Sequence, residues 1–509
     1  MPRSALALVI AVLMVSASWY WLGRPVEVAE PDVAGPLACL SYTPFRDGES
    51  PFDGEMPALR DAARLAEDLQ LLSTHTSCIR VYASVGMELI PPLAQKYGMQ
   101  VLMGAWVSSD TLATRQEIEA LVRIANAYPE TIRGVLVGNE ALLRREITPG
   151  ALVALIEEVK QRVPQPVSYA DVWEFHLSNP QVAAASEFVT IHILPYWEDE
   201  PVAIDAAVAH VRAIRHHVAG RMPGKPILIG ETGWPSAGRM REGALPSRVN
   251  AARFVRGFVA AAHAEGWDYN LIEAFDQPWK RQLEGAVGGY WGLFDTARQD
   301  KQLLRGAISN HPYRLLAALA VILAALPLLF LRLPPRLAPL VAMVAVGWTL
   351  QLEQLWLIVR NGAEVLAAGV MLGVLLAVAG AALARLAGRP WPARMEAPLL
   401  LLPGCMAAMV SLWLVFDPRY RDFFHAGFLP LAVLLTLPAM HRAAVVRCGA
   451  EEGLIGALLC LSAAFIALNE TAHNHQALAW SLASLLLGGV LLRRGVLASV
   501  GAGGLLRGQ

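Results

Sequence analysis

The stretch Ile227-Leu-Ile-Gly-Glu-Thr-Gly-Trp-Pro-Ser236 shows the plan on which the first half of the chain is built. A short apolar run ends in a glycine and a carboxylate, and a turn rich in glycine and proline follows. The run Val135-Leu-Val-Gly-Asn-Glu140 has the same form. Apolar runs of this length, followed by turn residues, indicate buried strands. We therefore expect both glutamates at the carboxyl ends of strands.

Runs of this kind recur along residues 35–311, separated by amphipathic stretches such as Thr148–Arg162 and Ser247–Ala264. Eight strand-helix repeats in one domain predict an α/β fold of the (β/α)₈ (TIM) barrel type. A doubly wound sheet is the alternative, but the even spacing favours a closed barrel. The predicted strands are Leu37–Tyr42, Ser77–Tyr82, Val101–Val107, Gly134–Gly138, Pro166–Ala170, Phe188–Ile193, Pro226–Gly230 and Tyr269–Phe275.

The composition of the whole chain points to a membrane part. Of its 509 residues, 55% are hydrophobic and only 17% are charged, which is more apolar than an ordinary soluble protein. The net charge of −1 gives no reason to expect a nucleic-acid partner. Residues 312–509 are predicted to form an all-α polytopic transmembrane domain with seven spans. These spans are residues 313–332, 338–359, 363–386, 397–416, 423–440, 453–469 and 475–493.

The first 34 residues are predicted to hold an uncleaved signal anchor, with a cleaved signal peptide as the alternative. Residues 5–22 are apolar and end in Trp19, Tyr20 and Trp21, which are typical of a membrane interface. Most arginines between the apolar segments fall on one side, which the positive-inside rule makes cytoplasmic. The anchor and seven spans then put both termini in the cytoplasm and the barrel domain outside. The loop 417–422 fits this topology least well, because it is predicted on the outer side but carries two arginines.

The two glutamates fall on the fourth and seventh predicted strands. Residues at the carboxyl ends of barrel strands line the mouth where catalysis takes place. Glycoside hydrolysis needs one carboxyl group to protonate the leaving group and one carboxylate to attack or to activate water. Ordinary acidic residues at strand ends are the alternative, but two glutamates in matching contexts favour Glu140 and Glu231 as a catalytic pair.

Five separated motifs between residues 37 and 300 resemble glycoside hydrolase family 17, in its bacterial membrane-linked branch. The resemblance implies a retaining β-1,3-glucan enzyme with Glu140 as general acid/base and Glu231 as nucleophile, and it implies no cofactor. The motifs are Ile79-Arg80-Val-Tyr82, Val137-Gly-Asn-Glu140, His192-Ile-Leu-Pro-Tyr-Trp197, Gly230-Glu-Thr-Gly-Trp-Pro-Ser236 and Glu273-Ala-Phe-Asp-Gln-Pro-Trp-Lys280.

A retaining mechanism requires the two carboxyl groups to lie about 5–5.5 Å apart. Glu231 must be ionised, and Arg80, Tyr82 and Tyr196 are candidate donors to it. Glu140 must hold a proton, and we expect ionised Glu231 to raise its pKa. Asn139 is expected to hydrogen-bond the 2-hydroxyl of the sugar.

Further substrate-binding candidates are polar and aromatic residues near the strand ends. Trp234 directly follows the nucleophile turn and is the preferred stacking platform for a sugar ring, although barrel packing is the alternative for every aromatic. Gln277 stands where plant family members have an acidic residue. The sequence therefore does not determine the contacts between Glu231 and Lys280. The remaining candidates are Asp171, Trp173, His192, Tyr196, Trp197, Glu273, Phe275, Asp276 and Lys280, with His192 as either a ligand contact or a core histidine.

The five cysteines show no metal-type spacing, and we predict no metal site. Cys39 and Cys78 fall on adjacent predicted strands. Two reduced thiols are the preferred interpretation, and a disulfide is the alternative. Glu353 lies inside a predicted span, where a contact within the helix bundle is favoured over a glucan or protein contact.

These features predict an enzyme at a bacterial inner (plasma) membrane whose periplasmic barrel binds β-glucan polysaccharide or oligosaccharide. The expected partners are the glucan, the lipid bilayer and other membrane proteins of glucan synthesis or export. Hydrolysis and transglycosylation both remain open. A membrane export or scaffold component with a glucan-binding barrel is the alternative function, and a synthase working from nucleotide sugars is disfavoured because no cytoplasmic Asp-x-Asp motif is present.

Overall fold

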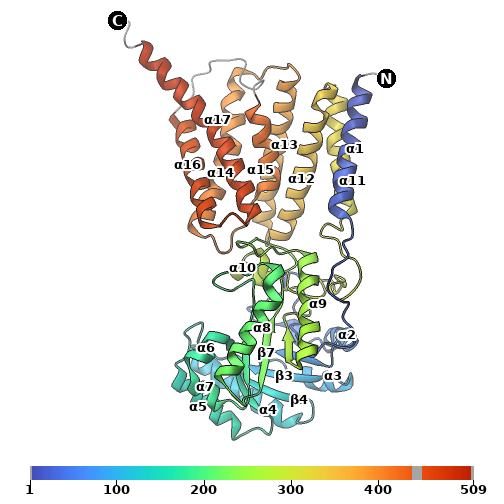
Figure 1. The fold of residues 1–509 in the computed structure, drawn as a ribbon, viewed down its shortest axis with the longest axis vertical. Coiled ribbons are helices and arrows are strands. Elements are labelled where there is room, and N and C mark those ends of the chain that lie inside the picture. Colours follow the sequence, from blue (N-terminus) through green and yellow to red (C-terminus); the bar gives the residue numbers. More distant parts are fainter. Residues whose placement is uncertain (1–2, 55, 438–449, 506–509) are drawn as a thin grey trace. The chain divides into compact units, whose positions relative to one another are not determined.

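The computed structural model describes residues 3–54, 56–437 and 450–505. The chain forms two compact units (Figure 1). One consists of Glu27–Ala237 and Ala244–Ile308, and the other of Met1–Val26, Gly238–Gly243 and Ser309–Gln509. Residues 27–34, predicted to belong with the anchor, lie in the first unit, where Asp32 pairs with Arg256 at 3.0 Å.

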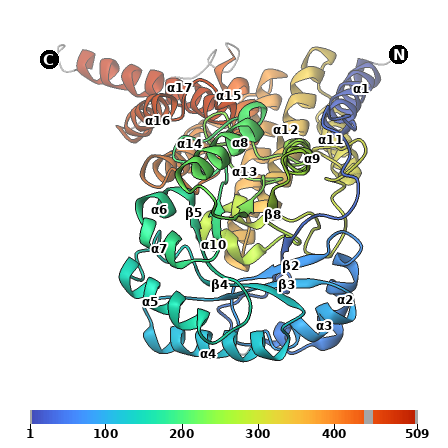
Figure 2. The same ribbon diagram turned by 60° about the horizontal axis from the view of Figure 1, so that its bottom comes forward.

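The first unit is a closed barrel of eight parallel strands in sequential order, which confirms the predicted fold class. Helices surround the strands, as Figure 2 shows for β2–β4 and helices α2–α7. The strands are β1 (Leu40–Ser41), β2 (Cys78–Val81), β3 (Gln100–Ala105), β4 (Ile132–Asn139), β5 (Val167–Val172), β6 (Val189–His192), β7 (Ile227–Thr232) and β8 (Asp268–Leu271).

The helices of the barrel unit begin where the sequence supplies capping residues. The Thr148 hydroxyl accepts the backbone N–H of Ala151, and the Ser247 hydroxyl accepts that of Asn250, which satisfies donors that a helix start leaves unpaired. The longer helices are α2 (Ala62–Leu72), α3 (Ile90–Lys96), α4 (Thr111–Ala127), α5 (Pro149–Lys160), α8 (Ile204–Arg221) and α9 (Arg248–Glu265). Short helices are α6 (Trp173–Ser178), α7 (Pro180–Ala185), α10 (Arg281–Glu284), η1 (Pro57–Leu59), η2 (Pro278–Lys280) and η3 (Ala286–Gly289).

The last strand is shorter than predicted. The sequence predicts Tyr269–Phe275, but β8 ends at Leu271. Beyond that point Glu273 N–H donates to the Trp291 carbonyl and Phe275 forms an isolated bridge with Phe294. The chain therefore leaves the barrel wall at its rim and pairs with a later loop.

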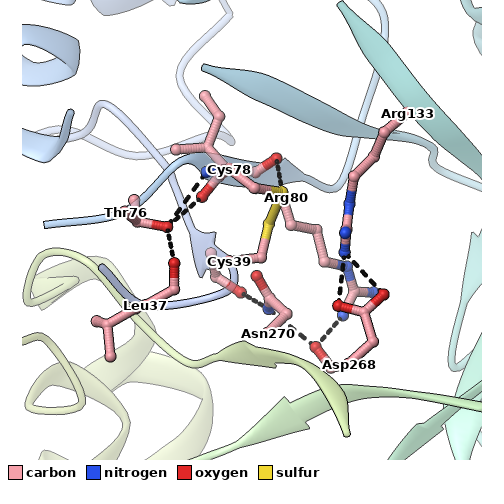
Figure 3. Close-up of a disulfide and its surroundings, with 11 residues drawn as sticks. Leu37, Cys39, Thr76, Cys78, Arg80, Arg133, Asp268 and Asn270 are labelled. Atoms are coloured by element: carbon pink, nitrogen blue, oxygen red, sulfur yellow. Dashed lines mark hydrogen bonds and ion pairs between the residues drawn. A yellow bond between two sulfur atoms is a disulfide. The ribbon is translucent and has the colours of Figure 1, made fainter. Parts of the chain in front are cut away.

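A disulfide joins Cys39 and Cys78, so the preferred interpretation of two reduced thiols is wrong (Figure 3). The reason is register: Leu40 pairs with Ile79, which sets the two preceding cysteines opposite one another, with Cα atoms 4.4 Å apart. Both cysteines are buried at the amino-terminal end of the barrel interior, with Leu102 and Leu228 beside them.

The second unit consists of apolar helices that match the eight predicted apolar segments. Six are long and apolar enough to cross a membrane, whereas α11 and α15 are shorter. The predicted segment 423–440 extends past residue 437 and so falls partly outside the described residues. The helices are α1 (Arg3–Gly23), α11 (Arg314–Phe330), α12 (Ala338–Ile358), α13 (Gly362–Leu386), α14 (Ala393–Phe416), α15 (His425–Thr436), α16 (Ala450–Asn469) and α17 (His475–Leu505), with η4 (Pro335–Leu337) before α12.

Hydrogen bonds between loops of this unit agree with the predicted alternation of sides. Arg389 donates to the Leu331 carbonyl at 2.9 Å, which joins two arginine-bearing connections. On the other predicted side, Arg239 donates to the Arg421 carbonyl and pairs with Glu470. Arg442 and Arg447 lie outside the described residues. Two of the arginine-bearing connections thus lie side by side, and so do the loops that hold Arg421 and Glu470.

Glu353 forms a contact within the helical unit. Its carboxylate lies 2.8 Å from Nδ1 of His311, and the edge of Trp19 packs against the His311 ring. Glu353 is 8% exposed. This placement favours a structural role for Glu353 over a contact with glucan or another protein.

Candidate active site

Glu140 and Glu231 come together at the carboxyl ends of β4 and β7. Glu231 is the fifth residue of β7, and Glu140 directly follows β4. Glu140 has a left-handed backbone with φ of 52°, and Gly138 before it has φ of 94°. These two turns direct the Glu140 side chain into the barrel mouth, where it is about one quarter exposed.

Gly230 allows close packing directly before Glu231. A Cβ atom at this residue would lie 2.4 Å from Cγ2 of Thr190 and 3.3 Å from both Arg80 and His192. The absent side chain lets β7 approach β6, so that Glu231 and His192 become neighbours in register.

His192 lies between the two glutamates. Its Nδ1 is 2.8 Å from Oε1 of Glu140, and its Nε2 is 3.6 Å from Oε1 of Glu231. One oxygen of each glutamate and one His192 nitrogen all lie within 4.8 Å of one another. The sequence allowed His192 to be either a ligand contact or a core histidine. In the structure it is buried and it contacts both carboxylates.

Arg80 supplies the positive charge of the site. From β2, its Nη1 lies 3.5 Å from Oε1 of Glu231 and donates to the Gly230 carbonyl at 2.7 Å. Its Nη2 donates to Oδ1 of Asn139 at 2.6 Å. The guanidinium of Arg80 thus lies beside Glu231 and also bonds the residue that precedes Glu140.

Tyr82 supports the site from one side. Its ring lies 4.5 Å from the Arg80 guanidinium carbon, and its hydroxyl hydrogen-bonds Ser41 at 2.7 Å. Burial, together with the charge of Glu231, raises the pKa of Tyr82 well above its ordinary value. The phenol therefore stays neutral and packs against Arg80 at physiological pH.

The pKa of Glu140 differs from the sequence-based expectation. Burial raises the pKa, but the hydrogen bond and charge of His192, together with Arg144 and Arg80, outweigh burial and lower it. The expectation rested on Glu231 alone and missed these three groups. Without substrate, Glu140 is therefore held as a carboxylate by its neighbours.

Glu273 and Lys280 form an ion pair within electrostatic reach of Glu231. Lys280 Nζ lies 3.0 Å from both oxygens of Glu273. Burial raises the pKa of Glu273 to about 7, although Lys280 opposes this. Glu284 joins the same environment, and its pKa is raised by burial. Of these, Glu273 is almost fully covered, whereas Lys280 and Glu284 are partly exposed.

Asp276 is engaged away from the carboxylates. It accepts Lys301 Nζ at 2.6 Å and the Gly292 N–H at 2.9 Å. Lys301 also donates to the hydroxyl of Ser236, at the end of the turn that follows Glu231. Asp276 thus holds two loops together, and nothing in its contacts favours a direct role with substrate.

Asp171 holds the turn that follows Glu140. It is fully buried and accepts hydrogen bonds from Tyr169 Oη and from the N–H groups of Leu143 and Val172. Burial raises the pKa of Asp171 to about 6. These contacts favour a positioning role over the predicted contact with substrate.

The aromatic candidates divide into buried and partly exposed residues. Trp234, Tyr196 and Phe275 are at most 1% exposed. The indole N–H of Trp234 donates to the Leu245 carbonyl. Trp234 was the preferred candidate for stacking on a sugar ring, but in the structure it packs within the barrel. Trp173 and Trp197 are partly exposed, and Trp106, after β3, is 40% exposed.

Sequence reasoning missed Arg144 and Asn270 among the residues that support the site. Arg144 Nη1 donates to the Asn139 carbonyl at 2.5 Å, and its guanidinium lies 4.3 Å from the Trp106 ring. Asn270 donates to the Gly230 carbonyl and to Ser41. Arg144 follows Glu140 by four residues, and this short spacing could have indicated that it lies near the site. Asn270 lies in an apolar strand without such a signal.

The barrel has eight parallel strands, and two glutamates meet at the ends of β4 and β7. This arrangement is typical of barrel glycosidases, which use a pair of carboxyl groups in catalysis. Residues 39–292 match the family model described as the BtgE/BtgC glycoside hydrolase domain. The barrel domain belongs to this family, which is of the glycoside hydrolase family 17 type.

Individual relatives cover the barrel and little else of this chain. A glucan 1,3-beta-glucosidase of Saccharomyces cerevisiae is 26% identical over 288 residues, which are 52% of this chain and 91% of that protein. The glucan 1,3-beta-glucosidase BGL2 of Candida albicans is 28% identical, over 51% of this chain and 91% of its own. A family 17 beta-1,3-glucanosyltransferase structure from Rhizomucor miehei is 25% identical with a TM-score of 0.47, covering 53% of this chain and 96% of that chain.

Proposed function

We propose that this protein is a retaining enzyme that acts on β-1,3-glucan by double displacement. Glu231 is the nucleophile and Glu140 the general acid/base. One observation carries the proposal: an oxygen of each glutamate lies within 4.8 Å of the other at the barrel mouth. Retaining enzymes need such a short separation, whereas inverting enzymes leave about 6.5–9.5 Å for a water molecule.

In the first step, a Glu231 oxygen attacks the anomeric carbon while the bond to the leaving-group oxygen breaks. Glu140 gives its proton to that oxygen, so the leaving sugar departs as an alcohol. Arg80 Nη1 lies 3.5 Å from Oε1 of Glu231 and so places a positive charge beside the attacking carboxylate. Entry of a sugar covers the site and separates Glu140 from solvent, which favours its protonated form.

In the second step, Glu140 takes a proton from an acceptor hydroxyl, and the acceptor oxygen displaces Glu231 from the anomeric carbon. Water as acceptor gives hydrolysis, and a sugar hydroxyl gives transglycosylation. Asn139 offers its amide nitrogen to the 2-hydroxyl of the bound sugar, because Arg80 already occupies its oxygen.

The substrate assignment rests on the relatives and on the residues around the mouth. The relatives are named as enzymes of 1,3-β-glucan. Partly exposed Trp106, Trp173 and Trp197 can pack against the apolar faces of sugar rings. Trp234, Tyr196 and Phe275 act as their packing support, since they are buried.

We place the protein in a bacterial inner membrane with the barrel on the periplasmic side and both termini in the cytoplasm. Six helices are long and apolar enough to span a bilayer. Two arginine-bearing connections of the helical unit lie side by side, as the positive-inside rule expects of a cytoplasmic end. The Cys39–Cys78 disulfide supports an oxidising compartment for the barrel.

A glucan export or scaffold component with a binding barrel is the competing function. Binding alone needs no ionised glutamate paired with a second carboxyl and a buried arginine, because burying such charges is costly. A Glu231→Gln variant distinguishes the two functions, since it removes the nucleophile while keeping the shape of the side chain.

The test uses the full chain in detergent with laminari-oligosaccharides. The wild type should form new oligosaccharides, and Glu231→Gln should form none above background. Products longer than the substrate indicate transfer, and shorter products alone indicate hydrolysis. Unchanged substrate with the folded wild type, together with retained glucan binding, would favour the export or scaffold function.

A further inference from the structure

Two aromatic side chains lie together on the loops that follow β1 and β8. Phe52 is 73% exposed, and its ring meets that of Trp279 edge to face, with ring centroids 5.8 Å apart. We propose that Phe52 and Trp279 form an aromatic platform for the donor arm of a β-glucan, the part of the glucan that stays attached to Glu231 when the leaving group departs. This inference rests on the proposed function and adds a specificity-determining site to it.

The position of the aromatic platform in the barrel assigns it to the donor side. Phe52 follows β1 and Trp279 follows β8, and these two strands pair at Leu40 and Leu271. In a closed ring of eight sequential strands β8 lies opposite β4, and Glu140 directly follows β4. Because Glu140 protonates the leaving sugar, that sugar extends over the β4 side of the mouth. The donor arm therefore extends toward β8 and β1.

Lys280 connects the aromatic platform with the carboxylate site. It directly follows Trp279, and its Nζ lies 5.8 Å from the centre of a Trp279 ring. The same amine lies 3.0 Å from both oxygens of Glu273 and within electrostatic reach of Glu231. The aromatic platform thus begins where the charged surroundings of Glu231 end.

Gln277 fixes the indole of Trp279. Its side-chain oxygen accepts the indole N–H at 2.9 Å, and its amide nitrogen donates to the carbonyls of Phe275 at 3.2 Å and Thr43 at 3.4 Å. An ionised carboxylate can only accept, so the acidic residue of plant family members would not make these contacts. Because the indole N–H is satisfied within the protein, the partly exposed side chain of Trp279 offers its apolar ring to a ligand.

The loop that carries Phe52 is braced, although Phe52 itself is exposed. The Glu49 carboxylate accepts the Arg46 N–H at 2.8 Å and Nη1 of Arg64 at 2.6 Å. Arg64 also donates to the Pro44 carbonyl at 2.8 Å. A surface that is already ordered loses less entropy when a ligand binds. A side chain that lies mostly in water contributes little to the core, so this bracing favours a binding role for Phe52.

A sugar chain fits the chemistry of this surface. The apolar faces of glucose rings pack on aromatic side chains, while the hydroxyl groups at the ring edges need polar partners. Asp47 and Arg281 form an ion pair at 3.7 Å that joins the same two loops, and Lys280 is partly exposed. An apolar protein partner would desolvate these charges at a cost, whereas sugar hydroxyls can hydrogen-bond them.

The experiment varies only the donor arm. The full chain in detergent is given dinitrophenyl β-glycosides with one to five β-1,3-linked glucosyl units, so that the leaving group stays constant. For the wild type, kcat/KM should rise with each unit up to the one that reaches the aromatic platform. Phe52→Ala should lose about 3- to 10-fold for the donors that reach it, as expected for the loss of an aromatic contact. The loss should be smallest for the one-unit glycoside.

Four further variants separate stacking from general damage. Phe52→Trp keeps a flat ring and should keep the dependence on donor length, whereas Phe52→Leu lacks a ring face and should behave as Phe52→Ala. Trp279→Leu should lose its rate at the same donor length as Phe52→Ala. Leu112→Ala removes another exposed apolar side chain, in the first turn of α4, and should match the wild type at every length. Thermal unfolding checks that each variant is folded.

A folded Phe52→Ala variant with the wild-type dependence on donor length would overturn the proposal. An equal loss at every length would also overturn it, because the damage would then lie in the common site. Unchanged kinetics with an altered oligomeric state would assign Phe52 to a contact between two copies of the chain, against the proposal.

A wild type that cleaves none of the glycosides contradicts the proposed function itself. The aromatic platform is then tested by calorimetric titration of laminaripentaose into the wild type and Phe52→Ala. A Kd raised about 3- to 10-fold by the substitution supports the aromatic platform, and equal Kd values or a wild type that does not bind would overturn it.

Discussion

Arg80 Nη2 donates a 2.6 Å hydrogen bond to Asn139 Oδ1, while Nη1 of the same guanidinium bonds the Gly230 carbonyl. One side chain from β2 therefore fixes the residues that precede both glutamates. The planar fork of arginine makes this possible, and a lysine ammonium has no equivalent geometry.

Arg80→Lys tests this link. We expect the charge near Glu231 to remain but the bond to Asn139 or to Gly230 to be lost, with kcat/KM falling about 10- to 100-fold for oligosaccharides, as happens when a positioning contact is lost. Arg123→Lys, on an exposed pair with Glu88, should act as wild type. Equal kcat/KM for the two variants would show that charge alone is sufficient.

Gly230→Ala tests the close approach of β7 to β6. The new methyl group would lie 2.4 Å from Cγ2 of Thr190, and overpacking of this kind costs about 1–3 kcal/mol. We expect a lower midpoint of thermal unfolding and reduced activity. Gly150→Ala in α5, where nothing lies within 4 Å, is the control and should not lower the midpoint. Similar midpoints for the two variants would contradict the packing argument.

Asp171→Asn tests the buried carboxylate behind Glu140. Its pKa is about 6 in the folded protein and 3.8 ordinarily, so the folded state binds more protons between these values. Stability from this group is therefore present at low pH and is lost as the pH rises from about 4 to 6. This shift of about two units corresponds to about 3 kcal/mol.

The expected result is a flatter dependence of unfolding free energy on pH in Asp171→Asn. The variant should be less stable than the wild type at pH 4, because Asn accepts fewer of the surrounding N–H and O–H donors, and the gap should narrow toward pH 7. Parallel curves from pH 4 to 7 would rule out the shifted pKa.

Lys301→Met tests the buried pair between Lys301 and Asp276. Removing the amine leaves Asp276 with one partner fewer in an interior site, and breaking a buried pair costs about 3–5 kcal/mol. Adding Asp276→Asn should recover most of the loss, because no unpaired charge remains. Denaturant unfolding of the single and double variants measures this, and a single variant as stable as wild type would refute a structural role for the pair.

The sequence predicted the barrel because its apolar runs recur with helical stretches between them, a pattern that few folds satisfy. Glu140 and Glu231 were predictable for the same reason, since strand ends meet at one mouth. His192 was also among the predicted site residues, but its contacts with both glutamates were not predictable, because they depend on a register shift between Ile191 and His192 against β7. The pairing of Cys39 with Cys78 also depends on register, which spacing along the chain does not determine.

Burial explains the remaining differences at the site. Trp234 follows Glu231 by three residues in the sequence, but its indole faces Phe254 and the Leu245 carbonyl. Asp276 belongs to a motif at the rim, but its partner Lys301 lies 25 residues later. A local motif predicts which residue types lie near a site. The direction of each side chain depends on the segments that pack against it, and these can be distant in the sequence.

The most direct test of the central claim is to trap the covalent intermediate on Glu231. The full chain is incubated with 2-deoxy-2-fluoro-β-laminaribiosyl fluoride, whose fluorine slows the second step, and its peptides are analysed by mass spectrometry. The account predicts one added glycosyl group on the peptide containing Glu231, and no label in Glu231→Gln. A label on another carboxylate, or turnover of laminari-oligosaccharides with inversion at the anomeric carbon, would contradict it.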